Sequence, residues 1–213
     1  MGAGRIGGGA ARMFARAGHE LLVSGGRNPS EFAELANEIG GRSGTTREAV
    51  DFGEVFVFSV PWRVIDDVLP SLGPLVGKIV IDTTNQFGSG GVEDLGGRTA
   101  AQVNAARMPG ARYTKSFNTL TSAFQEEASQ RTGVDRVALF VCGDDTEAKK
   151  LVSGLIADAG FVPVDVGGTA DAAPMEAPRR DGALYGEEYH EPEAREAAEA
   201  LRAGRPLPPT PQY

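Results

Sequence analysis

Three closely spaced glycines open the sequence, and they constrain its fold more than any other feature. The run Gly2-Ala3-Gly4-Arg5-Ile6-Gly7 matches the G-x-G-x-x-G pattern of dinucleotide-binding turns. In that pattern the first glycine makes a tight turn and the second lets backbone approach a pyrophosphate. The third lets the following helix pack closely on its sheet. Because a chain with 29 glycines can match by chance, the surrounding sequence has to support the motif.

The residues after the turn give that support. An apolar stripe at helical spacing is followed by a glycine of the kind that ends helices; its members are Ile6, Ala10, Met13, Phe14 and Ala17, with Gly18 after them. Residues 21–24 then predict a short buried strand. Turn, helix and strand in this order indicate the second half of a βαβ nucleotide-binding unit; the alternative is a glycine-rich N-terminal tail.

The strand that normally leads into such a turn is missing, because only Met1 precedes Gly2. In a doubly wound sheet that first strand is central and has neighbours on both edges. We therefore expect the natural product to start several residues upstream with an apolar strand, so that Met1 is an internal residue.

The loop after the second strand bears on the choice of cofactor. NAD-binding units carry an acid there that bonds the adenosine ribose, but this loop holds Ser24, Arg27 and Asn28 instead. A guanidinium pairs well with a 2′-phosphate. The loop favours NADP over NAD, and the alternative is that Arg27 is an ordinary solvated residue.

Two later segments predict buried parallel strands with polar ends, at residues 54–61 and 78–85. Ligands of doubly wound sheets lie outside the carboxyl ends of the strands. This places Ser59, Val60, Pro61, Trp62 and Asn85 at the cofactor crevice. For Trp62, the competing interpretation is a core residue of the next helix.

Further strands are predicted at residues 113–117, 137–141 and 161–165, with helices between them. The predicted fold is α/β: a Rossmann-like, doubly wound, mostly parallel sheet with helices on both faces. We assign residues 1–168 to this NADP-binding domain. Residues 169–213 form a polar C-terminal extension with a short helix and a proline-rich tail, either docked on the domain or on a neighbouring subunit, or partly disordered.

Composition excludes several classes of function. A formal charge of −8 with no basic stripe argues against nucleic acid. One cysteine, Cys142, rules out an intrachain disulfide and fits a buried structural thiol in a reducing cytosol. No apolar run reaches the roughly 20 residues of a membrane span. We expect a cytoplasmic protein whose partners are small-molecule cofactors.

The chain carries little acid–base chemistry. It has two histidines, His19 and His190, and no catalytic triad, metal-ligand spacing or phosphate-loop lysine. Reduction of a carbonyl usually needs a proton donor. Hydride transfer between two ring cofactors needs mainly proximity and alignment, so this pattern favours the latter.

Several motifs together resemble the NADPH-dependent reductases of the deazaflavin coenzyme F-420 and their short NADP-oxidoreductase-like relatives. The resemblance spans about residues 1–168, and the motifs are Gly2-Ala3-Gly4-Arg5-Ile6-Gly7, Ala17-Gly18-His19-Glu20, the loop through Ser24 and Arg27, Ser59-Val60-Pro61-Trp62, and Val141-Cys142-Gly143-Asp144-Asp145.

The resemblance implies an enzyme that passes hydride between NADP(H) and a flavin or deazaflavin acceptor. It places Ala3, Gly4, Arg5 and Ile6 at the pyrophosphate, and Arg27 at the 2′-phosphate. It also places Val60 and Pro61 near the nicotinamide, and Trp62, Asn118 and Thr119 on the substrate side.

Two features depart from the family: the missing first strand, and a polar end where the reductases have an apolar helical stretch that helps build the acceptor pocket and the dimer. The sequence is therefore compatible with a homodimer but does not establish one. The alternative function is a non-catalytic NADP(H)-sensing module, or a truncated and inactive reductase.

Overall fold

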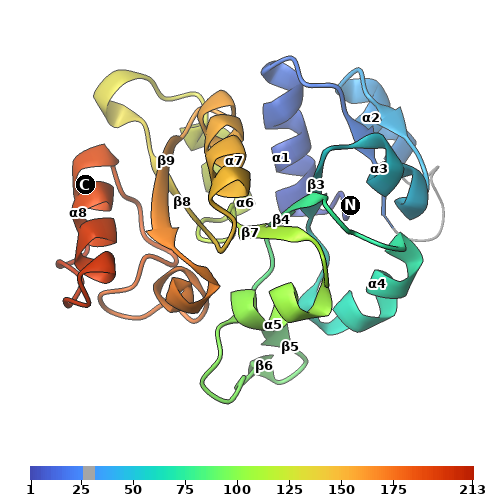
Figure 1. Ribbon diagram of the computed structural model, residues 1–213. Coiled ribbons are helices and arrows are strands. Elements are labelled where there is room, and N and C mark those ends of the chain that lie inside the picture. Colours follow the sequence, from blue (N-terminus) through green and yellow to red (C-terminus); the bar gives the residue numbers. More distant parts are fainter. Residues whose placement is uncertain (26–31) are drawn as a thin grey trace.

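A five-stranded, mostly parallel sheet flanked by helices forms the centre of the structure (Figure 1), and a two-stranded parallel sheet is separate from it. The protein is described by a computed structural model that covers residues 1–25 and 32–213. The larger sheet has five strands in the order β3 (Val55–Phe58), β4 (Ile79–Asp82), β7 (Arg112–Lys115), β8 (Ala138–Gly143) and β9 (Val162–Gly167). Only the β7–β8 pair is antiparallel. The smaller sheet is the parallel pair β1 (Leu22–Val23) and β2 (Arg42–Ser43).

Helices cover both faces of the larger sheet, because alternate residues of a strand point to opposite sides. One face packs on α1 (Arg5–Arg16), α6 (Ser122–Ala128) and α7 (Thr146–Asp158). The other packs on α3 (Thr46–Phe52), α4 (Ile65–Leu72), α5 (Ala100–Arg107) and α8 (Glu191–Arg202). Helix α2 (Ala33–Glu38) packs against β1 and β2. The predicted fold class is thereby confirmed.

Short elements complete the architecture. They are the 3₁₀ turns η2 (Trp62–Val64), η3 (Gly133–Asp135), η4 (Thr169–Asp171) and η5 (Ala173–Met175), and the hairpin β5 (Phe87–Gly88)–β6 (Gly91–Val92). This hairpin stands out from the body beside α5 (Figure 1).

Met1 and Gly2 bridge the gap between the two sheets. The amino group of Met1 donates to the carbonyl of Val57 (2.9 Å), and Ser59 N–H donates to the Met1 carbonyl (3.0 Å). On the other side, Gly2 N–H donates to the Ser24 carbonyl (2.8 Å). Met1 and Gly2 thus pair with β3 on one side and with the end of β1 on the other, in the manner of a short parallel strand.

A groove of about 220 Å³ continues this line beyond Met1. Its walls are mainly apolar side chains of β1, β3 and α1, among them Leu22, Val55, Val57 and Phe14. The groove also explains a difference from the sequence-based expectation. Phe56 and Phe58 of β3 are buried as predicted, but Val55 and Val57 are only partly buried, because they border this groove.

The C-terminal extension is docked on the domain. Helix α8 packs along β9 at the outer edge of the sheet (Figure 1) through a stripe of buried alanines: Ala194, Ala197, Ala198 and Ala200. Tyr189 is buried and packs edge-on against Phe140, with ring centroids 5.5 Å apart. Its carbonyl accepts from Ala138 N–H (2.7 Å). Of the three interpretations of this segment, docking on the domain is the one that the structure shows.

We predict that an apolar strand placed before Met1 stabilises the fold. Five β-branched residues fused to Met1 would continue the hydrogen bonds to β1 and β3 and bury apolar area in the groove. The melting temperature should rise by several degrees, whereas a Gly/Ser extension of the same length should change it little. Equal melting temperatures for the two fusions would contradict the assignment of the groove as a strand position.

A second prediction concerns pH. Burial lowers the pKa of the Met1 amino group to about 5 from its usual 8.0. The unfolded chain therefore binds a proton between pH 5 and 8 that the folded chain does not, so stability falls as pH drops through this window. Nα-acetylation removes the titrating group and keeps an N–H for Val57. The acetylated form should lose less thermal stability between pH 8 and pH 5 than the free amine, as measured by melting curves at both pH values.

Candidate functional site

The glycine turn leads into a helix whose N-terminus is open. Gly4 is the N-cap of α1; no side chain caps it, and no acidic residue lies in the first turn. The unpaired N–H groups and the helix dipole at such an end favour an anion. Local structure therefore leaves a place for a phosphate where the sequence predicts one.

Packing explains the three glycines separately. At Gly2 (φ +80°) a Cβ would lie 2.2 Å from the Ser59 carbonyl oxygen, and at Gly7 it would lie 2.0 Å from the Gly2 carbonyl oxygen. At Gly4 a Cβ would meet no protein atom within 4 Å. The first and third glycines thus permit close backbone packing, and the second leaves free space in front of the helix. Close packing at the first and third glycines is what the motif predicts, and the approach of a pyrophosphate to the second stays a prediction.

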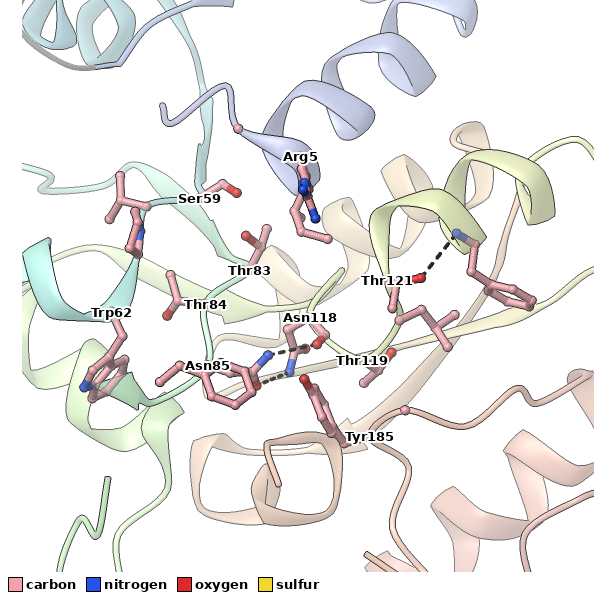
Figure 2. Close-up of a pocket in the computed structure, with 18 of the residues that line it drawn as sticks. Arg5, Ser59, Trp62, Thr83, Thr84, Asn85, Asn118, Thr119, Thr121 and Tyr185 are labelled. Atoms are coloured by element: carbon pink, nitrogen blue, oxygen red, sulfur yellow. Dashed lines mark hydrogen bonds between the residues drawn. The ribbon is translucent and has the colours of Figure 1, made fainter. Parts of the chain in front are cut away.

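A cavity of about 830 Å³ opens from this helix end across the carboxyl ends of β3, β4 and β7 (Figure 2). Ten of the residues predicted from the sequence line it: Gly4, Arg5, Ile6, Ser59, Val60, Pro61, Trp62, Asn85, Asn118 and Thr119. Its volume lies in the range of small-molecule sites.

The remaining predicted residues lie elsewhere. Gly2, Ala3 and Gly7 border the groove between the sheets, where they shape the turn. Ser24 is buried at the end of β1, and its Oγ has no hydrogen-bond partner among the described residues. Arg27 and Asn28 are outside the described residues, so their assignment to the 2′-phosphate stays a prediction.

Trp62 was predicted either to border the crevice or to be a core residue, and it does both. It is a core residue, 5% exposed, and it also lines the cavity. Its indole Nε1 donates to Glu93 (2.7 Å), and the Arg107 guanidinium lies 4.8 Å from its ring centroid. These contacts fix the ring at the edge of the cavity.

A buried polar cluster holds the end of β4 in place. Asp82 accepts from the Tyr113 hydroxyl (2.6 Å) and from Asn104 Nδ2 (2.8 Å), and its other oxygen accepts from Thr84 N–H (2.8 Å). Burial, followed by the charge of Asp82, raises the pKa of Tyr113, so that its hydroxyl stays protonated and donates. Lys115 is fully buried, with Nζ 3.6 Å from Asp82, and it donates to the Thr84 carbonyl.

The cluster continues into the C-terminal extension through Glu176. Its carboxylate accepts from the N–H groups of Ala100 (2.7 Å) and Ala101 (2.8 Å) at the start of α5, and it lies 4.0 Å from Lys115 Nζ. Thr83 and Thr84, which the cluster supports, line the cavity beside Asn85.

Asn85 and Asn118 face each other across the floor of the cavity (Figure 2). Asn85 Nδ2 donates to the Asn118 carbonyl (2.9 Å), and Asn118 Nδ2 donates to Asn85 Oδ1 (3.1 Å) and to the Met175 carbonyl (2.6 Å). Further bonds tie the extension to the same two loops: Gln86 Nε2 to the Ala177 carbonyl (2.8 Å) and Gly186 N–H to the Thr119 carbonyl (2.8 Å).

This arrangement makes the extension a wall of the cavity. Arg179, Tyr185, Gly186 and Glu188 line it. Tyr185 lies opposite Arg5 across the cavity (Figure 2), and burial raises the pKa of its hydroxyl. The sequence analysis missed this wall.

The other candidates for chemistry lie outside the cavity. Neither histidine lines it. His19 bonds Asp158 (3.0 Å), and His190 bonds Glu188 (3.0 Å). Burial raises the pKa of Cys142 to about 12, as expected for an inert structural thiol. Residues 1–25 and 32–213 contain no group of three His, Cys, Asp or Glu side chains that could hold a metal.

Comparison with known proteins identifies relatives of this chain. Residues 1–86 match the family model described as NADP oxidoreductase coenzyme F420-dependent. This confirms the resemblance read from the sequence. The chain is related to NADP-dependent oxidoreductases. It is 31% identical over 156 residues to Metalloreductase STEAP3 of Rattus norvegicus, and the match covers 73% of the chain but only 31% of that relative.

Solved structures share the fold. A hypothetical protein from Sinorhizobium meliloti superposes with a TM-score of 0.80 at 28% identity, over 89% of this chain and 92% of that one. An Arthrobacter protein described as an F-420-dependent NADP reductase gives a TM-score of 0.71 at 23% identity, over 80% and 84% of the two chains. A reductive aminase from Aspergillus terreus, solved with NADPH, gives 0.56 at 23% identity, over 79% and 54%. In the part of this chain that is described, no helix has the length and hydropathy needed to cross a membrane.

We predict that Lys115→Met destabilises the fold by about 3 kcal/mol or more, because Asp82 and Glu176 would stay buried without their cation. Lys150→Met, at an exposed lysine of α7, is the matched control and should change stability by less than about 0.5 kcal/mol. Urea unfolding of both variants measures this. Equal stabilities would mean that Lys115 does not compensate the two carboxylates.

Proposed function

We propose that this protein is an NADP(H)-dependent oxidoreductase that transfers a hydride between NADPH and a planar ring acceptor of the flavin or deazaflavin type. The observation that carries the proposal is the pairing of two features in one cavity. One is an uncapped helix end with free space at Gly4, and the other is a lining of hydroxyl and amide side chains.

The residues present fit the dinucleotide. The start of α1 would bind the pyrophosphate through backbone N–H groups, with Arg5 beside it. The unpartnered Ser24 Oγ would bond a group of the adenosine ribose, and Arg27 would pair with the 2′-phosphate. The bound nicotinamide supplies the hydride. Ser59, Val60 and Pro61 would orient its ring, and Asn118 and Thr119 would face the acceptor.

The lining of the cavity contains no histidine, and Tyr185 is its one tyrosine. The one carboxylate among its lining residues is Glu188. Desolvation opposes its charged form, but hydrogen bonds from His190 and Arg131 outweigh this effect and lower the pKa of the carboxyl. Glu188 is therefore ionised and paired, and unsuited to donating a proton. Hydride transfer to a ring needs alignment above all, which these residues can provide.

The first test is binding. Gly4→Ala adds a methyl group where no protein atom lies within 4 Å, so the variant should fold normally. It should nevertheless weaken NADPH binding about tenfold or more, because the methyl group occupies the phosphate position. Gly9→Ala, in the same helix and equally unobstructed, is the control. Fluorescence titration measures both, and equal affinities would contradict the phosphate site.

The choice of cofactor is tested at Arg27. Arg27→Ala should weaken NADPH binding about tenfold and leave NADH binding unchanged, because only NADPH carries the 2′-phosphate. Turnover with NADPH and a soluble flavin then separates an enzyme from a sensing module: tight binding of NADPH without oxidation would favour the sensor.

A further inference from the structure

The cavity has two walls of different charge. The cofactor wall is formed by the start of α1 and by η2, and it presents the exposed side chains of Arg5 and Arg63. The ion pairs formed within residues 1–25 and 32–213 include neither of them. With the positive end of the α1 dipole, this wall suits an anion.

The acceptor wall lies opposite (Figure 2) and is formed by two segments, residues 118–124 and the lining residues of 179–188. The first segment, Asn-Thr-Leu-Thr-Ser-Ala-Phe, has no charged side chain. The second contributes one cation to the cavity lining, Arg179. Its guanidinium is already held by Glu187 in a two-pronged pair, at 2.6 and 2.9 Å.

The other charged lining residue of this wall, Glu188, is also paired. Glu188 bonds Arg131 (2.6 Å), which in turn is held by Glu127 (2.9 Å). Arg180 forms no ion pair within the described residues, but it does not line the cavity, and it donates to the backbone carbonyls of Ala173, Glu176 and Pro178. Within residues 179–188, three carboxylates stand against two guanidinium groups. The lining of this wall therefore offers an anionic acceptor no cation that lacks a carboxylate partner, and a phosphate without a partner is costly to desolvate.

An uncharged ring finds better partners on the same wall. Leu120 and Phe124 give apolar surface, and Phe87 of β5, 46% exposed, also lines the cavity. The Tyr185 hydroxyl, kept protonated by the burial that raises its pKa, can donate to a ring carbonyl. Backbone bonds to Pro174 (3.1 Å) at Tyr185 and to Thr119 (2.8 Å) at Gly186 hold this tyrosine in place.

We propose that the hydride acceptor of this protein is an uncharged planar ring compound of the riboflavin type, and that phosphate-bearing flavins are poor acceptors. The inference rests on the proposed hydride transfer and narrows it to a substrate class. In the balanced reaction the acceptor ring gains one hydride from bound NADPH and one proton from solvent, and the dinucleotide leaves as NADP⁺.

The test compares riboflavin with FMN, which share one ring system and differ by the phosphate. We expect kcat/KM for NADPH oxidation to be about tenfold higher with riboflavin. Added salt should narrow the gap, because it screens charges that lie more than about 10 Å apart at 0.1 M. Equal values, or a preference for FMN, would overturn the inference and leave hydride transfer standing. A protein that binds NADPH but reduces neither flavin would overturn the proposed function and this inference with it.

One variant tests the cause of the discrimination. Glu187→Gln frees the Arg179 guanidinium at the cavity, so the riboflavin-to-FMN ratio of kcat/KM should fall several-fold. Glu191→Gln is the matched control: it removes the same charge from an exposed ion pair with Arg195 on α8 (2.6 Å), and the ratio should not change. If both variants shift the ratio equally, net charge governs selectivity and the assignment to the acceptor wall is wrong.

Discussion

The hydrogen bonds of Met1 and Gly2 hold the site together. They connect Ser24 in the smaller sheet with Val57 and Ser59 in the larger one, at the point where the carboxyl ends of β1 and β3 meet α1. If these bonds shift, the start of α1 moves relative to Ser59, and the close approach of Gly2 to the Ser59 carbonyl is lost. The phosphate position and the Ser59 side of the cavity therefore depend on the same few backbone contacts.

The sequence predicts this part of the molecule well because its signals are local. The glycine spacing, the helical stripe to Phe14 and the left-handed Gly18 (φ +87°) all appear within 20 residues. The ends of strands are also predicted from local sequence. Asn85 is assigned to the cavity because it follows a buried apolar strand. Thr83 and Thr84 are polar residues at the end of the same strand, directly before Asn85. The same pattern therefore predicts that they also face the cavity.

The other wall could not be read from the sequence, since long-range contacts create it. Gln86 bonds Ala177 across 91 positions, and Asn118 bonds Met175 across 57. Neither the loops at Gln86 and Asn118 nor the extension has a sequence pattern that predicts these contacts. Helix α8 was predicted, but its packing face consists of alanines between glutamates and arginines, so its sequence resembles that of a solvated helix. Lys115 is similar: a lysine in a short strand gives no sign that carboxylates from two other segments surround it.

Charge pairing gives this acidic chain two distinct surfaces within one cavity. Its net charge of −8 would by itself repel any anionic ligand, so binding of a dinucleotide requires local cations that are not consumed by ion pairs. The chain leaves Arg5 and Arg63 unpaired within its described part and pairs Arg179 and Arg131 with neighbouring carboxylates. Arginine therefore has two roles in this chain. An arginine without an ion-pair partner attracts a phosphate, whereas an arginine paired with a carboxylate stabilises a loop and offers an anion no net charge. Which arginines have partners, more than how many arginines there are, determines where an anion can bind.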